Sequence, residues 1–90
     1  MSSRLRLTPA LRDVLQQLRN VPDEVWGLLL SSLSGRPTGT VYPILDRLER
    51  ECFVRSRWET DNDRKGPRRR LYHLTDEGRS WVNERLGRAT

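Results

Sequence analysis

The segment FVRSRWETDNDRKGPRRRLYHL, residues 53–74, decides how the fold of this chain is interpreted. Its first six residues, 53–58, alternate apolar and polar side chains, as a half-buried strand does. A turn-rich stretch with glycine and proline follows, and residues 69–74 have the composition of a second short strand. The segment therefore predicts a β-hairpin with a long loop at its tip.

The loop of this hairpin carries the excess positive charge of the chain. The 90 residues include 17 Lys and Arg and 12 Asp and Glu, a formal net charge of +5. Residues 64–70 hold five basic side chains and no acidic one, so the rest of the chain is neutral. A local basic patch is typical of a protein that binds a polyanion. We therefore predict DNA contacts at Arg64, Lys65, Gly66, Arg68, Arg69 and Arg70, with a charged loop kept for solubility as the alternative.

Two helical segments begin the chain. Thr8 followed by Pro9 is a typical helix start, and apolar residues then recur at helical spacing, which predicts a helix over residues 9–19. Residues 1–7 are expected to form a flexible basic tail. A second helix is expected over residues 23–33, because acidic residues suit its N-terminal end and a glycine turn follows it.

A third helix is expected to open at Pro37 or Thr38. Four apolar residues at helical spacing would form its inward face: Val41, Ile44, Leu45 and Leu48. Pro43 lies early in this helix, where the loss of a backbone hydrogen bond costs least, so we expect a local distortion and no break. Two helices joined by a short turn form a helix-turn-helix pattern.

The order of these segments predicts a winged helix. A last helix is expected to start at Thr75 and to end near Gly87. The fold class is therefore mainly helical with a small β-hairpin, in the order α-α-α-β-β-α. Residues 8–90 would form a single domain, with the last helix, about 75–88, as a candidate dimerisation element.

The composition argues against several kinds of site. Cys52 is the only cysteine, and no apolar run approaches the length of a membrane span or a secretory leader. These features favour a cytoplasmic, nucleoid-associated protein without a disulfide. His73 is the only histidine, no spacing provides the ligands of a zinc site, and no catalytic set is recognisable. We expect no enzyme activity, no metal and no cofactor.

Two motifs resemble the PadR-like family of winged-helix transcriptional regulators. PTGTVYPILDRLERE, residues 37–51, is similar to the family's recognition helix, and GPRRRLYHLTDEG, residues 66–78, is similar to its wing and the start of the following helix. EVWGLLL, residues 24–30, resembles the family's second helix. The resemblance covers roughly residues 7–82 and implies a DNA-binding regulator in which Tyr42 is a DNA contact.

The chain departs from this family in two respects. Members usually have glycine where Cys52 stands, so the cysteine is expected to accept an unfavourable backbone conformation. Many members also carry a separate C-terminal helical domain for dimerisation, whereas this sequence ends at Thr90. A dimer is therefore expected to use the first and last helices, through Leu11, Leu15, Trp81, Val82 and Leu86. A response to a small-molecule effector stays open.

The start of the third helix is the second predicted DNA contact. A major groove about 12 Å wide admits one helix, whose early outward residues lie nearest the bases. These residues, with one in the preceding turn, are Arg36, Thr38, Gly39, Thr40, Tyr42, Pro43 and Arg47. For Tyr42 the alternative is a half-buried ring that packs against the wing.

These features together predict a sequence-specific double-stranded DNA-binding regulator. Two-fold symmetry would make it a homodimeric repressor on a palindromic operator, with half-sites about 10 bp or a multiple apart. A winged-helix module that binds protein or RNA is one alternative. An architectural DNA-binding factor of the phage or plasmid type is another.

Overall fold

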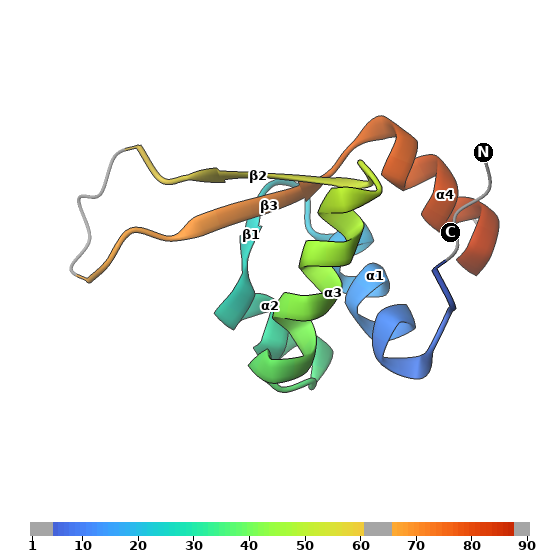
Figure 1. Ribbon diagram of the computed structural model, residues 1–90, viewed down its shortest axis with the longest axis horizontal. Helices are drawn as coiled ribbons and strands as arrows, with labels where there is room; N and C mark the ends of the chain where they lie inside the picture. Colours follow the sequence, from blue (N-terminus) through green and yellow to red (C-terminus); the bar gives the residue numbers. More distant parts are fainter. Residues whose placement is uncertain (1–4, 61–65, 88–90) are drawn as a thin grey trace.

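The helices and strands form a winged helix with one more strand than the sequence suggested (Figure 1). The computed structural model describes residues 5–60 and 66–87. The elements follow one another as α1 (Pro9–Asn20), β1 (Val25–Trp26), α2 (Gly27–Ser34), α3 (Thr38–Arg50), β2 (Val54–Trp58), β3 (Arg70–Leu74) and α4 (Asp76–Leu86). The fold is mainly helical with a small antiparallel sheet, as predicted.

Helix α1 starts where the sequence predicted. The Thr8 hydroxyl accepts a hydrogen bond from the backbone N–H of Leu11 at 3.1 Å, and Pro9 is the first helical residue. The residues just before this cap differ from the prediction of a flexible tail. Leu5 and Leu7 are partly buried and pack against the core, so apolar contacts attach this part of the tail to the domain.

The second predicted helix is wrong over its first four residues. Val25 and Trp26 form strand β1, which pairs antiparallel with β3, and α2 begins only at Gly27. A β-branched and an aromatic residue both suit a strand, and β3 offers an edge for them to pair with. The end of the helix was predicted correctly, because Gly35 adopts the left-handed conformation with φ 73°.

Helix α3 continues through its proline. It spans 13 residues and contains Pro43, so the helix does not break there. Val41, Leu45 and Leu48 are completely buried, and Ile44 packs partly against the same core. The predicted inward face of this helix is confirmed.

The sheet has the strand order β1-β3-β2. Residues opposite one another in an antiparallel pair share a face of the sheet. Three such pairs between β2 and β3 fall on the face toward the helices: Val54 with Leu74, Ser56 with Tyr72, and Trp58 with Arg70. The first two pairs reach the core, whereas Trp58, which is 53% exposed, lies beyond it.

The core contains most of the side chains that we expected at a dimer interface. Leu11, Leu15, Trp81 and Val82 are each at most 7% exposed, and Leu86 is half-buried. The Trp81 ring stacks on Phe53 with ring centroids 4.8 Å apart. Four of these five side chains are thus enclosed in the core of one chain, and a dimer contact through the five stays a prediction.

Cys52 has the unfavourable backbone expected of it. Its φ is 63°, and it is the only non-glycine residue with positive φ within residues 5–60 and 66–87. A side chain in this conformation costs roughly 1–2 kcal/mol, part of which the greater freedom of glycine in the unfolded chain offsets. We expect Cys52→Gly to raise the free energy of unfolding by up to about 1 kcal/mol, and Cys52→Val to lower it by at least about 1 kcal/mol. Urea denaturation measures both, and a stabilising valine would contradict this account of the turn.

Candidate nucleic-acid interface

The strands β2 and β3 project beyond the helical body (Figure 1). We call residues 54–60 and 66–74 the wing. Near its base, Val54 and Leu74 anchor the wing in the core. Further out, the same face carries Trp58 and Arg70. The wing therefore presents one aromatic and one cationic side chain on the side that faces the helices.

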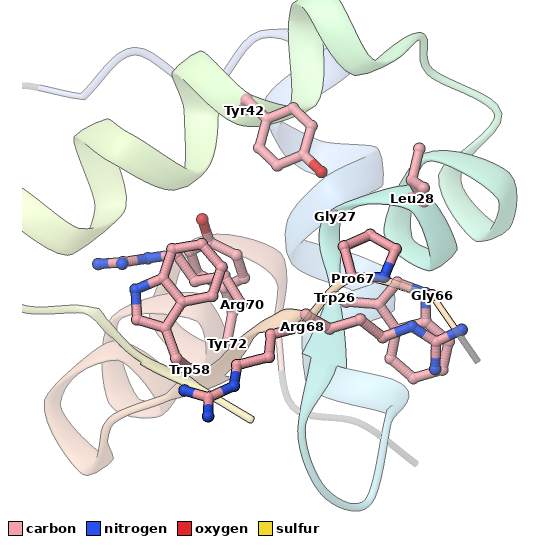
Figure 2. A pocket seen from close by; sticks show the side chains of 11 residues that line it. Trp26, Gly27, Leu28, Tyr42, Trp58, Gly66, Pro67, Arg68, Arg70 and Tyr72 are labelled. Atoms are coloured by element: carbon pink, nitrogen blue, oxygen red, sulfur yellow. The ribbon is translucent and has the colours of Figure 1, made fainter. Parts of the chain in front are cut away.

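A pocket of about 510 Å³ lies between the wing and the helices (Figure 2). Three parts of the chain line it: the wing, the N-terminal end of α2 with the preceding strand, and Tyr42 of α3. The lining residues are Trp26, Gly27, Leu28, Tyr42, Trp58, Gly66, Pro67, Arg68, Arg69, Arg70 and Tyr72. We call this the wing pocket. It brings the basic part of the wing and Tyr42 of α3 to a single concave surface, and among the described residues none that lines it is acidic.

Aromatic rings position two of the wing arginines. The Arg69 guanidinium lies 3.9 Å from the centroid of Trp26, and that of Arg70 lies 5.4 Å from the centroid of Trp58. Arg70 also lies 3.8 Å from the Glu49 carboxylate of α3. Such cation–π contacts hold a guanidinium over the face of a ring. Arg68 is exposed, and Arg64 and Lys65 lie outside the described residues.

Tyr42 packs against Gly27 at the start of α2. A Cβ atom placed on Gly27 would lie 2.4 Å from Cε1 and Cζ of Tyr42, so only glycine lets the ring occupy its observed position. The ring is nevertheless 43% exposed and lines the wing pocket. The contact with Gly27 therefore fixes the direction in which Tyr42 presents its hydroxyl (Figure 2).

The other predicted contacts on α3 separate into two groups. Gly39, Pro43 and Arg47 are exposed, whereas Thr38 and Thr40 are half-buried. The sequence interpretation missed Asp46 and Arg50, which are exposed and form an ion pair with Nη2 of Arg50 2.9 Å from Oδ2 of Asp46. Helical spacing would have found them, since residues 39, 43, 46 and 50 follow one line along a helix.

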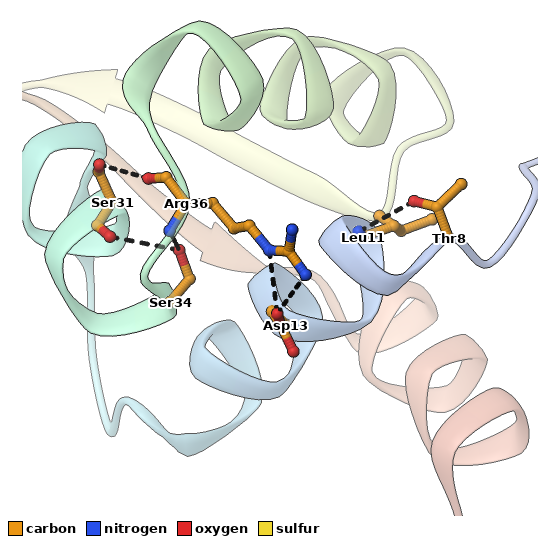
Figure 3. A network of polar contacts seen from close by, with 6 residues as sticks. All are labelled: Thr8, Leu11, Asp13, Ser31, Ser34 and Arg36. Carbon is orange, nitrogen blue, oxygen red and sulfur yellow. Dashed lines mark hydrogen bonds and ion pairs between the residues drawn. The ribbon is translucent and has the colours of Figure 1, made fainter.

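Arg36, predicted as a DNA contact, has a partner within the chain (Figure 3). Its Nε and Nη2 donate to Oδ2 of Asp13 on α1 at 3.0 and 2.8 Å. Ser31 and Ser34 hold the backbone of Arg36 through hydrogen bonds of 2.5 and 3.2 Å. The side chain ties the turn before α3 to α1, so we assign it to the framework of the helix-turn-helix.

A second ion pair, which the sequence did not indicate, fixes the wing to the body. Arg57 of β2 donates through Nε and Nη2 to the two carboxylate oxygens of Glu24 at 2.7 and 2.5 Å. This hydrogen bonding lowers the pKa of Glu24 and raises that of Arg57. The pair spans the sheet from the start of β1 to β2 and restricts the angle of the wing.

Residues 5–60 and 66–87 contain neither a candidate metal site nor a candidate membrane-spanning helix. In these ranges no group of three or more His, Cys, Asp or Glu side chains could hold a metal ion. Nor does either range contain a helix long and apolar enough to cross a bilayer.

The fold is similar to those of several solved regulators. A probable transcriptional regulator from Pseudomonas aeruginosa is 21% identical with a TM-score of 0.73, covering 90% of this chain and 58% of that one. A PadR family regulator from Clostridium difficile is 22% identical, with a TM-score of 0.68 and coverage of 83% and 82%. Bacillus subtilis PadR, solved in complex with operator DNA, is 23% identical, with a TM-score of 0.70 and coverage of 89% and 48%.

The sequence itself matches one family model. This chain spans just over half the length of several of its structural neighbours. No curated protein matches the sequence. The model of the transcriptional regulator PadR-like family, a family of regulators and not of enzymes, matches residues 13–84, which is most of the chain. The chain therefore belongs to the PadR-like family of transcriptional regulators.

Proposed function

We propose that this protein binds double-stranded DNA sequence-specifically and regulates transcription, with α3 in a major groove and the wing on the adjacent minor groove. The wing pocket carries the proposal, because it is lined both by Tyr42 of α3 and by the wing residues Gly66 to Arg70. The two predicted DNA contacts therefore belong to one surface. The similar fold of Bacillus subtilis PadR, solved in complex with operator DNA, supports the same assignment.

The shape of this surface suits one particular part of a duplex. A helix in the major groove and a hairpin at the next minor groove are separated by the sugar–phosphate backbone that runs between the grooves. In our proposal this backbone occupies the wing pocket. Arg68 and the ring-supported Arg69 would then meet phosphate oxygens and Trp58 would pack against a sugar, while Tyr42, on the α3 side of the pocket, would face a base edge.

We further propose a homodimeric repressor that occupies a palindromic operator. Helix-turn-helix proteins commonly pair in this way, with half-sites one helical turn or a multiple apart. Four of the five side chains predicted at the interface are buried within one chain and the fifth, Leu86, is half-buried, so their role in the dimer remains a prediction. Light scattering should give about twice the 10.6 kDa chain mass if the dimer forms without DNA.

Selection of bound duplexes from a random pool tests the proposal most directly. The expected result is a consensus of two inverted half-sites whose spacing reports the symmetry of the complex. Equal binding to structured RNA would favour the alternative of an RNA-interaction module. Strong bending of DNA with little sequence preference would favour an architectural factor. Absence of any duplex binding would contradict the proposal.

The contact between Gly27 and Tyr42 predicts that a mutation outside α3 alters DNA discrimination. Gly27→Ala would place a methyl group where the tyrosine ring lies, so the ring must move. We expect the preference for selected over random duplex to fall about tenfold, equivalent to removing one interaction with a base worth roughly 1.4 kcal/mol. Fluorescence anisotropy with both duplexes measures this preference.

A double-mutant cycle provides the control for this prediction. In a Tyr42→Ala background there is no ring for the added methyl group to displace, so Gly27→Ala should have little further effect. Additive losses would show that the glycine acts through something other than Tyr42.

A further inference from the structure

We propose that Asp46 is a specificity-determining residue of the DNA interface, and that its carboxylate selects a cytosine in the operator. The inference rests on the proposed function, because it concerns how α3 discriminates between sequences. The side chain of Asp46 is 58% exposed on α3 and shares a line of the helix with Gly39 and Pro43.

This line lies at the centre of the exposed face of α3. The buried residues Val41, Leu45 and Leu48 occupy the opposite side of the helix. Gly39 has no side chain and Pro43 has neither a donor nor an acceptor on its ring. Asp46 is therefore the first residue along the line whose side chain can form a hydrogen bond with a base edge.

The chemistry of a carboxylate restricts what Asp46 can face. An ionised aspartate only accepts hydrogen bonds, so it pairs with donors and is repelled by phosphate oxygens. In the major groove the amino group N4 of cytosine is the donor that Asp and Glu usually recognise. Asp46 would therefore oppose every docking position that places it at the backbone and favour one that places it at a cytosine.

The ion pair with Arg50 is the competing explanation for Asp46. The side chains of Arg50 and Asp46 are 76% and 58% exposed and lie four residues apart, with 2.9 Å between Nη2 and Oδ2. An exposed pair of this kind contributes little stability, so approaching DNA can separate it at small cost. Arg50 would then neutralise a phosphate and leave the carboxylate to the bases.

The test compares two substitutions that change the net charge equally. Asp46→Asn removes the negative charge from α3, and Glu84→Gln removes one from an exposed position on α4. Because asparagine both donates and accepts, Asp46→Asn should lower the preference for the selected duplex over random duplex about tenfold. Repeated selection should replace a cytosine by adenine in each half-site, since Asn pairs with adenine. Glu84→Gln should change neither.

Three outcomes would overturn the inference. One is an unchanged preference ratio in Asp46→Asn, and another is an equal change in Glu84→Gln. The third is the disappearance of the Asp46→Asn effect in an Arg50→Gln background, which would show that Asp46 acts only by holding Arg50. The proposed function stands in all three cases, because the unsubstituted protein still binds its selected duplex. If that protein binds no duplex, both proposals are wrong.

Discussion

Replacement of Arg68 and Arg69 by alanine is expected to weaken binding to every duplex, selected or random, by about 100-fold. Each arginine supplies a hydrogen bond to a charged group, worth roughly 1.5 kcal/mol at the lower end of the measured range. These bonds carry no sequence information, so the ratio between selected and random DNA should be preserved. The plot of log K against log salt should become less steep by about 2, one unit for each phosphate that is no longer neutralised.

The single substitutions separate charge from packing. Arg68→Ala removes an exposed side chain and should flatten the salt dependence by about 1 without altering stability. Arg69→Ala should do the same and also uncover Trp26, on which the guanidinium lies at 3.9 Å. Arg79→Ala is the matched control, because it removes one exposed charge from α4 at a position that does not line the wing pocket. An equal loss in Arg79→Ala would mean that net charge, and not the wing, attracts the DNA.

The helices and the hairpin were predictable because their determinants are local. Helix α1 follows from a capping threonine and a proline that stand beside each other in the sequence. The inward face of α3 follows from the spacing of Val41, Leu45 and Leu48. Strand β1 was missed because two residues carry no periodicity, and Val25 and Trp26 become a strand only through pairing with β3, more than forty residues away.

At the site, too, the features that the sequence did not show depend on contacts between residues distant in sequence. Arg36 was predicted at DNA because it is basic and stands in the turn before α3, but Asp13 on α1 binds its guanidinium. Tyr42 was expected either at DNA or against the wing, and its packing against Gly27 could not be found before α2 was positioned. The packing of Trp81 depends on a distant residue in the same way. The sequence could not show that this side chain, expected against the first helix or a second subunit, stacks on Phe53 in the core.

Gly78 packs directly against the backbone of Phe53 in this core. Gly78→Ala is expected to lower the free energy of unfolding by about 3 kcal/mol or more, beyond the usual 1–3 kcal/mol for overpacking because backbone must move. A Cβ atom at this position would lie 1.9 Å from the carbonyl oxygen of Phe53 and 2.7 Å from its carbonyl carbon. That oxygen also accepts a hydrogen bond from the backbone N–H of Thr75, the residue that caps α4. The methyl group would therefore push the start of α4 away from Phe53 and from the base of the wing.

The expected loss of stability is opposite to the usual effect of this exchange. Replacing glycine by alanine inside a helix normally stabilises the helix by roughly 0.8–1 kcal/mol. Gly39→Ala is the matched control, because Gly39 lies within α3 and nothing comes within 4 Å of its added Cβ. Thermal denaturation should show a higher Tm for Gly39→Ala and a Tm lower by about 15 °C for Gly78→Ala, since each kcal/mol shifts Tm by roughly 4–8 °C in a domain of this size. If Gly78→Ala were also stabilised, α4 would not pack on Phe53, and the anchor of the wing on the helical body would have to be assigned elsewhere.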